Sequence, residues 1–94
     1  MPATLTRVLV VIRGEIDIAT SPALKATLAA GLGRDIEVDL SGVTFMDASG
    51  IGVLLAARRQ AAEAGGSLTL RAPSAAVRRL TEVLGLDEVL PTVG

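Results

Sequence analysis

Residues 36–50 read IEVDLSGVTFMDASG, which joins a predicted strand to the start of a predicted helix. Ile36, Val38 and Leu40 alternate with acidic residues, the period of a strand that buries one face. Ser41-Gly42 predicts a turn, and a short apolar segment follows it. The last four residues, DASG, therefore lie between an apolar approach and a helix N-terminus. Open α/β folds commonly place their functional residues at such a point.

The helix after this stretch is expected from about residue 49 to residue 64, with Gly65-Gly66 ending it. At about 100° per residue, one apolar face is expected to be buried, and it carries Ile51, Leu54 and Leu55. The opposite arc carries Ser49, Val53, Ala56 and Gln60. Small apolar residues on an outward face let another surface come close. Val53 and Ala56 therefore predict a docking strip next to Ser49.

Strand and helix signals alternate along the rest of the chain. Strands are predicted at residues 8–12, taken to be buried on both faces, and at residues 68–70. One helix is predicted to start at Thr20-Ser21-Pro22, a capping hydroxyl followed by a proline in the first turn, and another is predicted after Ser74. Residues 86–90 predict a short strand or a helical turn. The β-α-β-α-β-α order favours an α/β fold with a largely parallel or mixed sheet covered by helices.

The composition excludes several classes of protein. The 94 residues are 50% apolar, enough for the core of one domain, and the net charge of −1 argues against a nucleic-acid partner. Without cysteine or histidine the chain can form neither a disulfide nor a Ser-His-Asp triad, and a zinc site is not expected. No segment reaches the roughly 18 apolar residues of a membrane span, and the N-terminus lacks a signal-peptide pattern, so no membrane contact and a cytoplasmic location are expected.

The segment Asp47-Ala48-Ser49-Gly50 allows two interpretations from its residues alone. In the structural one, Asp47 or Ser49 caps the helix, and the glycines let the turn pack closely. In the functional one, Ser49 accepts a chemical group near the positive end of the helix dipole. The two are compatible, because a serine at a capped helix start can also accept a phosphate.

Four segments carry a family resemblance: residues 14–17 (GEID), 38–54 (VDLSGVTFMDASGIGVL), 64–66 (AGG) and 84–86 (LGL). Together they resemble the anti-sigma factor antagonists of the STAS family, and the match spans nearly the whole chain. The resemblance implies an α/β fold with a single STAS domain over residues 1–94. It also implies a mixed four- to five-stranded sheet covered by about four helices.

The resemblance further implies a partner-switching protein and not an enzyme. In that family the unphosphorylated antagonist binds an anti-sigma factor, itself a serine kinase, and so releases a sigma factor. The kinase phosphorylates the serine of an Asp-x-Ser-Gly motif, and a serine phosphatase reverses the modification. No cofactor is expected on the chain itself, since ATP is supplied through the kinase. A monomer or a weak dimer is expected.

Matched residue by residue, the resemblance makes Ser49 the phosphate acceptor and Asp47 its acidic neighbour at the partner surface. Asp17, in the GEID run, matches another position near that surface. With the docking strip added, the residues expected at the partner surface are Asp17, Asp47, Ala48, Ser49, Gly50, Gly52, Val53 and Ala56.

The chain departs from the family pattern at two places. Ala48 stands where many members carry serine or threonine, which leaves Ser49 as the acceptor of the motif. The family usually has a strand before the one predicted at residues 8–12, and Ala3 to Thr6 is barely long enough for it. Either that strand is vestigial or the edge of the sheet is open to pairing.

Other functions fit the residues less well. A receiver-type phosphoaspartate domain needs a lysine late in the chain, whereas the only lysine is Lys25 in the first predicted helix. Gly50-Ile51-Gly52 is only a fragment of a dinucleotide-binding fingerprint. Within the family, the alternative is an accessory subunit of a lipid transport or stress-sensing complex. Ser49 in its Asp-x-Ser-Gly setting favours the antagonist.

Overall fold

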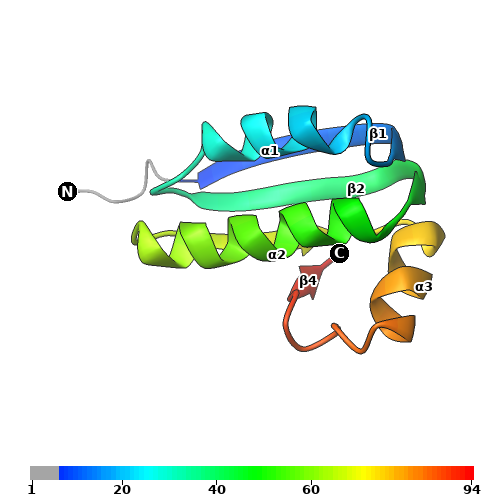
Figure 1. Ribbon diagram of the computed structural model, residues 1–94. Helices are drawn as coiled ribbons and strands as arrows, with labels where there is room; N and C mark the ends of the chain where they lie inside the picture. Colours follow the sequence, from blue (N-terminus) through cyan, green and yellow to red (C-terminus); the bar gives the residue numbers. More distant parts are fainter. Residues whose placement is uncertain (1–6) are drawn as a thin grey trace.

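The computed structural model describes residues 7–94 as a parallel sheet with helices packed on it (Figure 1). Its elements are β1 (Arg7–Ile16), α1 (Ser21–Ala29), β2 (Asp35–Met46), α2 (Ala48–Glu63), β3 (Ser67–Arg71), α3 (Ala75–Val83) and β4 (Thr92–Val93). The strands lie in the order β1-β2-β3-β4, and every neighbouring pair is parallel. None of these helices is long and apolar enough to cross a membrane.

The α/β class is confirmed, and the details of the sheet differ from expectation. The sheet formed by the described residues has four strands and is wholly parallel, which agrees with the largely parallel sheet favoured by the order of the elements; no antiparallel strand of a mixed sheet lies among residues 7–94. Three helices accompany it within residues 7–94, against the expected four or so. Because each connection between paired strands here carries a helix, parallel pairing follows directly. The possible strand at residues 3–6 lies outside the described residues.

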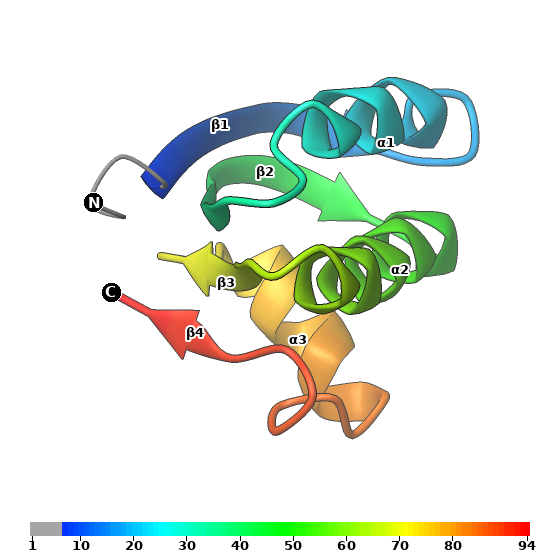
Figure 2. The same cartoon turned by 90° about the vertical axis from the view of Figure 1, so that its left-hand side faces the viewer.

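Helices α1 and α2 lie side by side on one face of the sheet (Figure 2). The predicted apolar face of α2 is confirmed: Ile51 and Leu54 are buried, and Leu55 packs partly buried against the core. Leu24 and Leu28 of α1 are buried as well. They meet the inward side of β2 and β3, which carries Ile36, Val38, Leu40, Leu68 and Leu70. The alternation seen in residues 36–40 is therefore the inner surface of the sheet.

Strand β1 was expected to be buried on both faces, and this prediction is wrong. Within the sheet formed by residues 7–94 it is the outermost strand, and only its helix-facing side is covered, where Val10 and Ile12 pack against the core. On the other side Leu9 is 56% exposed and Val11 is 50% exposed. A run of aliphatic residues identifies a strand but not how many of its faces are covered.

The turn predicted at Ser41-Gly42 does not form, and β2 continues to Met46. The reason is the long pairing with β1, which extends to a final pair between Ile16 and Met46. The register of the two strands shifts between Val11 and Arg13, so their pairing continues past Ser41-Gly42. Gly42 fits there because a Cβ at this position would come within 3.0 Å of the Arg13 side chain.

The ends of the helices are partly as predicted. Ser74 caps α3, its Oγ accepting from the Val77 N–H at 3.3 Å. Thr20 precedes α1, but its hydroxyl donates to the Glu15 carbonyl at 3.0 Å instead of capping the helix. Residues 86–90 form the helical turn, and the short strand β4 that follows was not predicted.

Helix α2 begins at a tightly packed junction. Asp47 is the capping residue, and its Oδ1 accepts from the Ser49 N–H at 2.9 Å. Gly50 is buried where the helix meets the sheet, and a Cβ there would lie 2.8 Å from both Ile16 Cγ2 and Met46 Cγ. Nothing lies within 4 Å of the corresponding position at Gly52. The backbone at Gly50 therefore has no space for a side chain, whereas the backbone at Gly52 has.

We expect Gly50→Ala to lower the free energy of unfolding by about 1–3 kcal/mol, the usual result of overfilling a packed site. Gly52→Ala is the matched control, because its methyl meets nothing and alanine favours a helix by about 0.5–1 kcal/mol. Urea denaturation of the two variants measures both changes. Equal changes in the two variants would contradict the packing described for Gly50.

We expect Asp47→Ala to destabilise the protein by about 0.5–2 kcal/mol, because it removes the cap of α2. Asp47→Asn keeps an oxygen that can accept from the same N–H group, so it should stay within a few tenths of a kcal/mol of the parent. Thermal or urea unfolding compares the two. A loss in the asparagine variant as large as that in the alanine variant would show that the charge, and not the cap, stabilises this helix start.

Candidate functional site

The candidate site lies where β1 and β2 end together. The Asp47 N–H donates to the Ile16 carbonyl at 3.1 Å, which places the segment after β1 directly beside the segment after β2. The structure thus brings Asp17 close to the start of α2. The two acidic residues implied by the family resemblance come from different parts of the chain and share one edge of the sheet.

Asp17 shapes its own loop. Its Oδ1 accepts from the N–H groups of Ala19 at 3.0 Å and Thr20 at 3.1 Å, and the Asp17 N–H donates to Thr20 Oγ1 at 2.9 Å. These bonds hold the connection between β1 and α1 in one conformation. The geometry gives Asp17 a structural role in presenting the loop, whatever it contacts in a partner.

The same loop presents an apolar residue that was not predicted. Ile18 is 80% exposed, more than any other large hydrophobic residue among the described ones. Single exposed apolar residues are common on protein surfaces, so Ile18 is of interest for its place beside Asp17 and the start of α2. In the sequence, Ile18 can be recognised as a β-branched residue between the end of a strand and the start of a helix. It belongs to the apolar pattern of neither element.

The Ser49 hydroxyl is half-buried and donates to Oδ1 of Asp47, the same oxygen that accepts from the Ser49 N–H. These bonds lower the pKa of the Asp47 carboxyl: the Ser49 hydroxyl contributes most, partial desolvation opposes it, and the backbone N–H groups of Ser49 and Gly50 add to it. Each stabilises the ionised carboxylate. The Ser49 hydroxyl is thus oriented by a negative charge, while its oxygen lone pairs stay available.

Ser49 also opens onto a groove of about 250 Å³ between α1 and α2. The groove is lined by Lys25 and Ala29 from α1 and by Ser49, Gly52, Val53, Ala56, Ala57 and Gln60 from α2. The predicted docking strip was expected to face outward, and the structure instead makes it one wall of this groove. Val53 is only partly exposed and packs against the core.

The remaining residues expected at the partner surface differ in exposure. Ala48 is exposed beside Asp47 and Ser49, and Gly52 is exposed on the groove. Gly50 is buried, so it shapes the turn from below and offers no surface of its own. The structure therefore brings most of the predicted set together, on one side of the N-terminal turn of α2.

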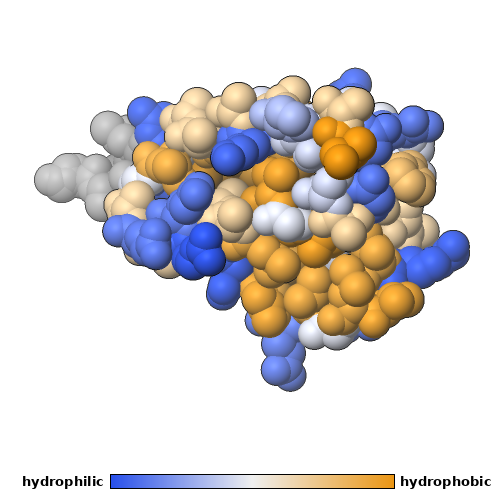
Figure 3. Space-filling model, viewed as in Figure 1, coloured by the Kyte–Doolittle hydropathy of each residue, from blue (hydrophilic) through white to orange (hydrophobic). Residues whose placement is uncertain are grey.

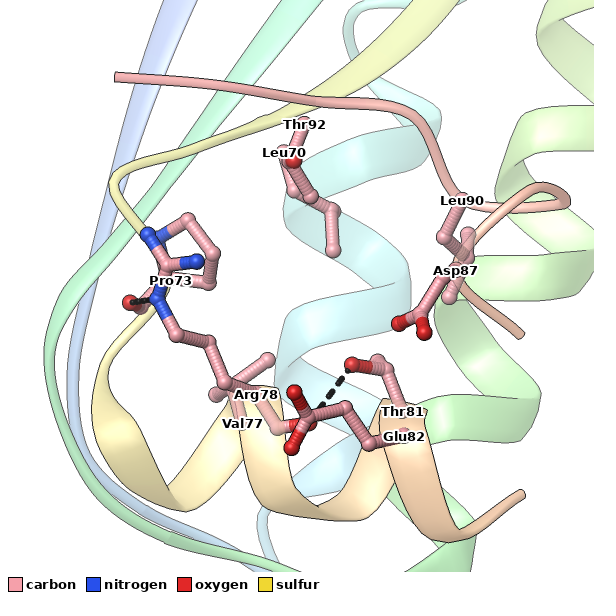
Figure 4. Close-up of a pocket in the computed structure, with 9 residues that line it drawn as sticks. All are labelled: Leu70, Pro73, Val77, Arg78, Thr81, Glu82, Asp87, Leu90 and Thr92. Atoms are coloured by element: carbon pink, nitrogen blue, oxygen red, sulfur yellow. Dashed lines mark hydrogen bonds between the residues drawn. The ribbon is translucent and has the colours of Figure 1, made fainter. Parts of the chain in front are cut away.

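A second hollow lies on α3 and holds none of the predicted site residues (Figure 4). Its polar groups are largely used within the fold: Arg78 Nε donates to the Pro73 carbonyl at 3.1 Å, and Thr81 Oγ1 donates to the Arg78 carbonyl at 2.9 Å. The carboxylates of Glu82 and Asp87 reach its rim (Figure 4). No group of three or more acidic residues that could hold a metal ion occurs among residues 7–94.

Apolar surface also gathers below α2, over α3 and the C-terminal segment (Figure 3). Val83 at the end of α3 is 76% exposed, and Leu84 at 47% and Val89 at 43% are exposed in the segment that follows α3. This region lies away from the groove that contains Ser49, which runs between α1 and α2. It therefore provides exposed apolar residues for comparison with Ile18.

Comparison with known proteins agrees with the fold and with the resemblance. The family described as "Mlab, STAS domain" matches residues 2–92. The anti-sigma-B factor antagonist of Bacillus subtilis (strain 168) is 35% identical over 81 residues, 84% of this chain and 74% of that protein. The anti-sigma F factor antagonist of Lysinibacillus sphaericus is 34% identical over 88 residues, 87% of this chain and 75% of that protein.

Among solved structures, an anti-sigma factor antagonist from Mycobacterium paratuberculosis superposes with a TM-score of 0.82 at 30% identity. The match covers 94% of this chain and 77% of that one. The family match extends over nearly the whole sequence, and the two relatives are identical to it at about a third of the aligned residues. The chain belongs to the STAS domain family.

Proposed function

We propose that this protein is an anti-sigma factor antagonist whose unphosphorylated form binds an anti-sigma factor with serine kinase activity and so releases a sigma factor. Ser49 is the residue that the kinase phosphorylates. The observation that carries the proposal is the half-exposed Ser49 hydroxyl, oriented by Asp47 at the edge where two loops meet. The two relatives at 34–35% identity, both named as antagonists of anti-sigma factors, support it.

The protein is proposed to act by binding and not by catalysis. Its site offers the Ser49 hydroxyl, the carboxylates of Asp17 and Asp47, and a groove lined by small residues, Gln60 and Lys25, which suit a contact surface. The partner kinase supplies ATP, and a separate serine phosphatase removes the phosphate. Ile18, Ala48 and the groove beside Ser49 are the surfaces that the kinase would cover.

Phosphorylation would change the electrostatics of this surface more than the fold. It adds a charge of about −1.5 to −2 and removes the hydroxyl proton that Ser49 donates to Asp47. Asp47 still accepts from the Ser49 N–H, so the cap of α2 is retained. The helix dipole favours the added charge by about 0.3–1 kcal/mol, while Asp47 repels it by a similar amount.

The effect at an interface is larger. A charge buried without a partner costs several kcal/mol, and each 1.4 kcal/mol is a tenfold change in affinity. Loss of binding by about a hundredfold or more therefore requires no change of conformation. The phosphate blocks a contact.

We expect Ser49→Asp to bind its partner kinase with about a hundredfold lower affinity than the parent. Ser49→Ala should bind the kinase and resist phosphorylation. Ala62→Asp is the control, because it adds the same charge at the exposed far end of α2 and should bind as the parent does. Pull-down from native lysate identifies the partners, and binding to the purified kinase measures each affinity.

Two outcomes would contradict the proposal. Phosphorylation of the purified Ser49→Ala protein by its kinase would show that Ser49 is not the acceptor. Recovery of transport-complex subunits in equal amounts with the parent and with Ser49→Asp would favour the accessory-subunit role instead.

We expect Ile18→Ser to weaken binding of the same kinase by about tenfold or more. Burying one such side chain contributes about 1.5–3 kcal/mol, and this change removes most of that contribution. Val83→Ser is the matched control, since Val83 is 76% exposed but lies on α3. Calorimetric titration of the kinase with each variant compares them. Equal losses from both substitutions would show that Ile18 holds no special place in the interface.

A further inference from the structure

Lys25 stands out on the wall of the groove opposite Ser49. It is the only lysine of the sequence and the only charged residue among those that line the groove. The two ion pairs of the described residues both involve Glu37 on the outer side of the sheet, so Lys25 takes part in neither. Its ammonium group is exposed on a flexible stem of four carbons, which can reach an anion in the groove.

The fold places Lys25 and Ser49 at similar levels on neighbouring helices. Both α1 and α2 follow strands that run parallel to each other, so the two helices start at the same edge of the sheet (Figure 1). Ser49 lies in the first turn of α2, and Lys25 lies in the second turn of α1. Together they line one groove of about 250 Å³.

A phosphate on Ser49 has two directions available. On one side lies Asp47, where the hydrogen bond from the hydroxyl would be replaced by repulsion between like charges. On the other side lies the groove, whose only charge is positive. The electrostatic preference is therefore for a phosphate turned away from Asp47 and into the groove, toward Lys25.

We propose that Lys25 binds the phosphate of Ser49 in the groove between α1 and α2. The proposal rests on Ser49 as the phosphorylated residue of the proposed function. The ion pair places the phosphate over the small residues Gly52, Val53 and Ala56, so that it covers the wall a partner would otherwise contact. Lys25 neutralises only part of the phosphate's charge of about −1.5 to −2, so the remaining negative charge and the filled groove both oppose binding of a partner.

The test uses full-length protein with phosphoserine incorporated at position 49 during synthesis, so that no kinase is needed. The second ionisation of the phosphate, ordinarily near pH ~6, is followed by phosphorus NMR in the parent and in Lys25→Gln. A nearby cation favours the dianion. We expect the titration midpoint of the parent to lie lower than that of Lys25→Gln by about 0.2–0.7 pH units.

Three comparisons separate the ion pair from a general effect of charge. Lys25→Arg should restore the low midpoint, and the difference should shrink at high salt, because about 1 M salt screens charges beyond roughly 3 Å. Arg59→Gln removes a positive charge from an exposed site on α2 outside the groove and should leave the midpoint near that of the parent. Equal midpoints in the parent and Lys25→Gln would overturn the proposal, and so would an equal rise in Arg59→Gln.

The result is independent of the proposed function. If the kinase modified a residue other than Ser49, the antagonist mechanism would fail while the NMR titration still reported on the groove. If the titration midpoint did not depend on Lys25 while the kinase still phosphorylated Ser49, only the proposed ion pair would be wrong.

Discussion

The pairing of β1 with β2 along their whole length is the constraint on which the site depends. It carries β2 past the point where β3 departs and ends on the pair between Ile16 and Met46. The Asp47 N–H then continues the contact by donating to the Ile16 carbonyl. Had β2 stopped at Ser41, the start of α2 would lie several residues away from the loop that carries Asp17 and Ile18. The length of one ladder thus determines which residues share a surface.

Much of the fold could be predicted from local patterns, because these patterns report on local physics. The alternation at residues 36–40, the apolar face of α2 and the cap at Ser74 were all found as expected. The exposed face of β1 could not be predicted, since coverage of a strand depends on its place in the sheet. The continuation of β2 was missed because a Ser-Gly pair signals a turn only where no partner strand holds the chain extended.

In the candidate site, too, local features could be predicted from the sequence and tertiary ones could not. The motif around Ser49 is contiguous in the sequence, so it was found there, and its assignment as an acceptor came from the family resemblance. The groove is formed by two helices, and Lys25 lies 24 residues before Ser49 in the sequence. No periodicity within one helix reveals which residues of another stand across from it. The docking strip was accordingly predicted as an outward face, whereas it forms one wall of the groove.

The close approach at Gly50 has a consequence for how a modifying enzyme can recognise this protein. The shape of the turn that presents Ser49 is set by Ile16 and Met46 beneath it, which come from two different strands. A short peptide of the same local sequence would lack both supports and would sample many conformations. On the proposed function, the kinase would therefore recognise a folded epitope and not a linear motif. If Ser49 is phosphorylated as proposed, its phosphate therefore marks chains that have already folded.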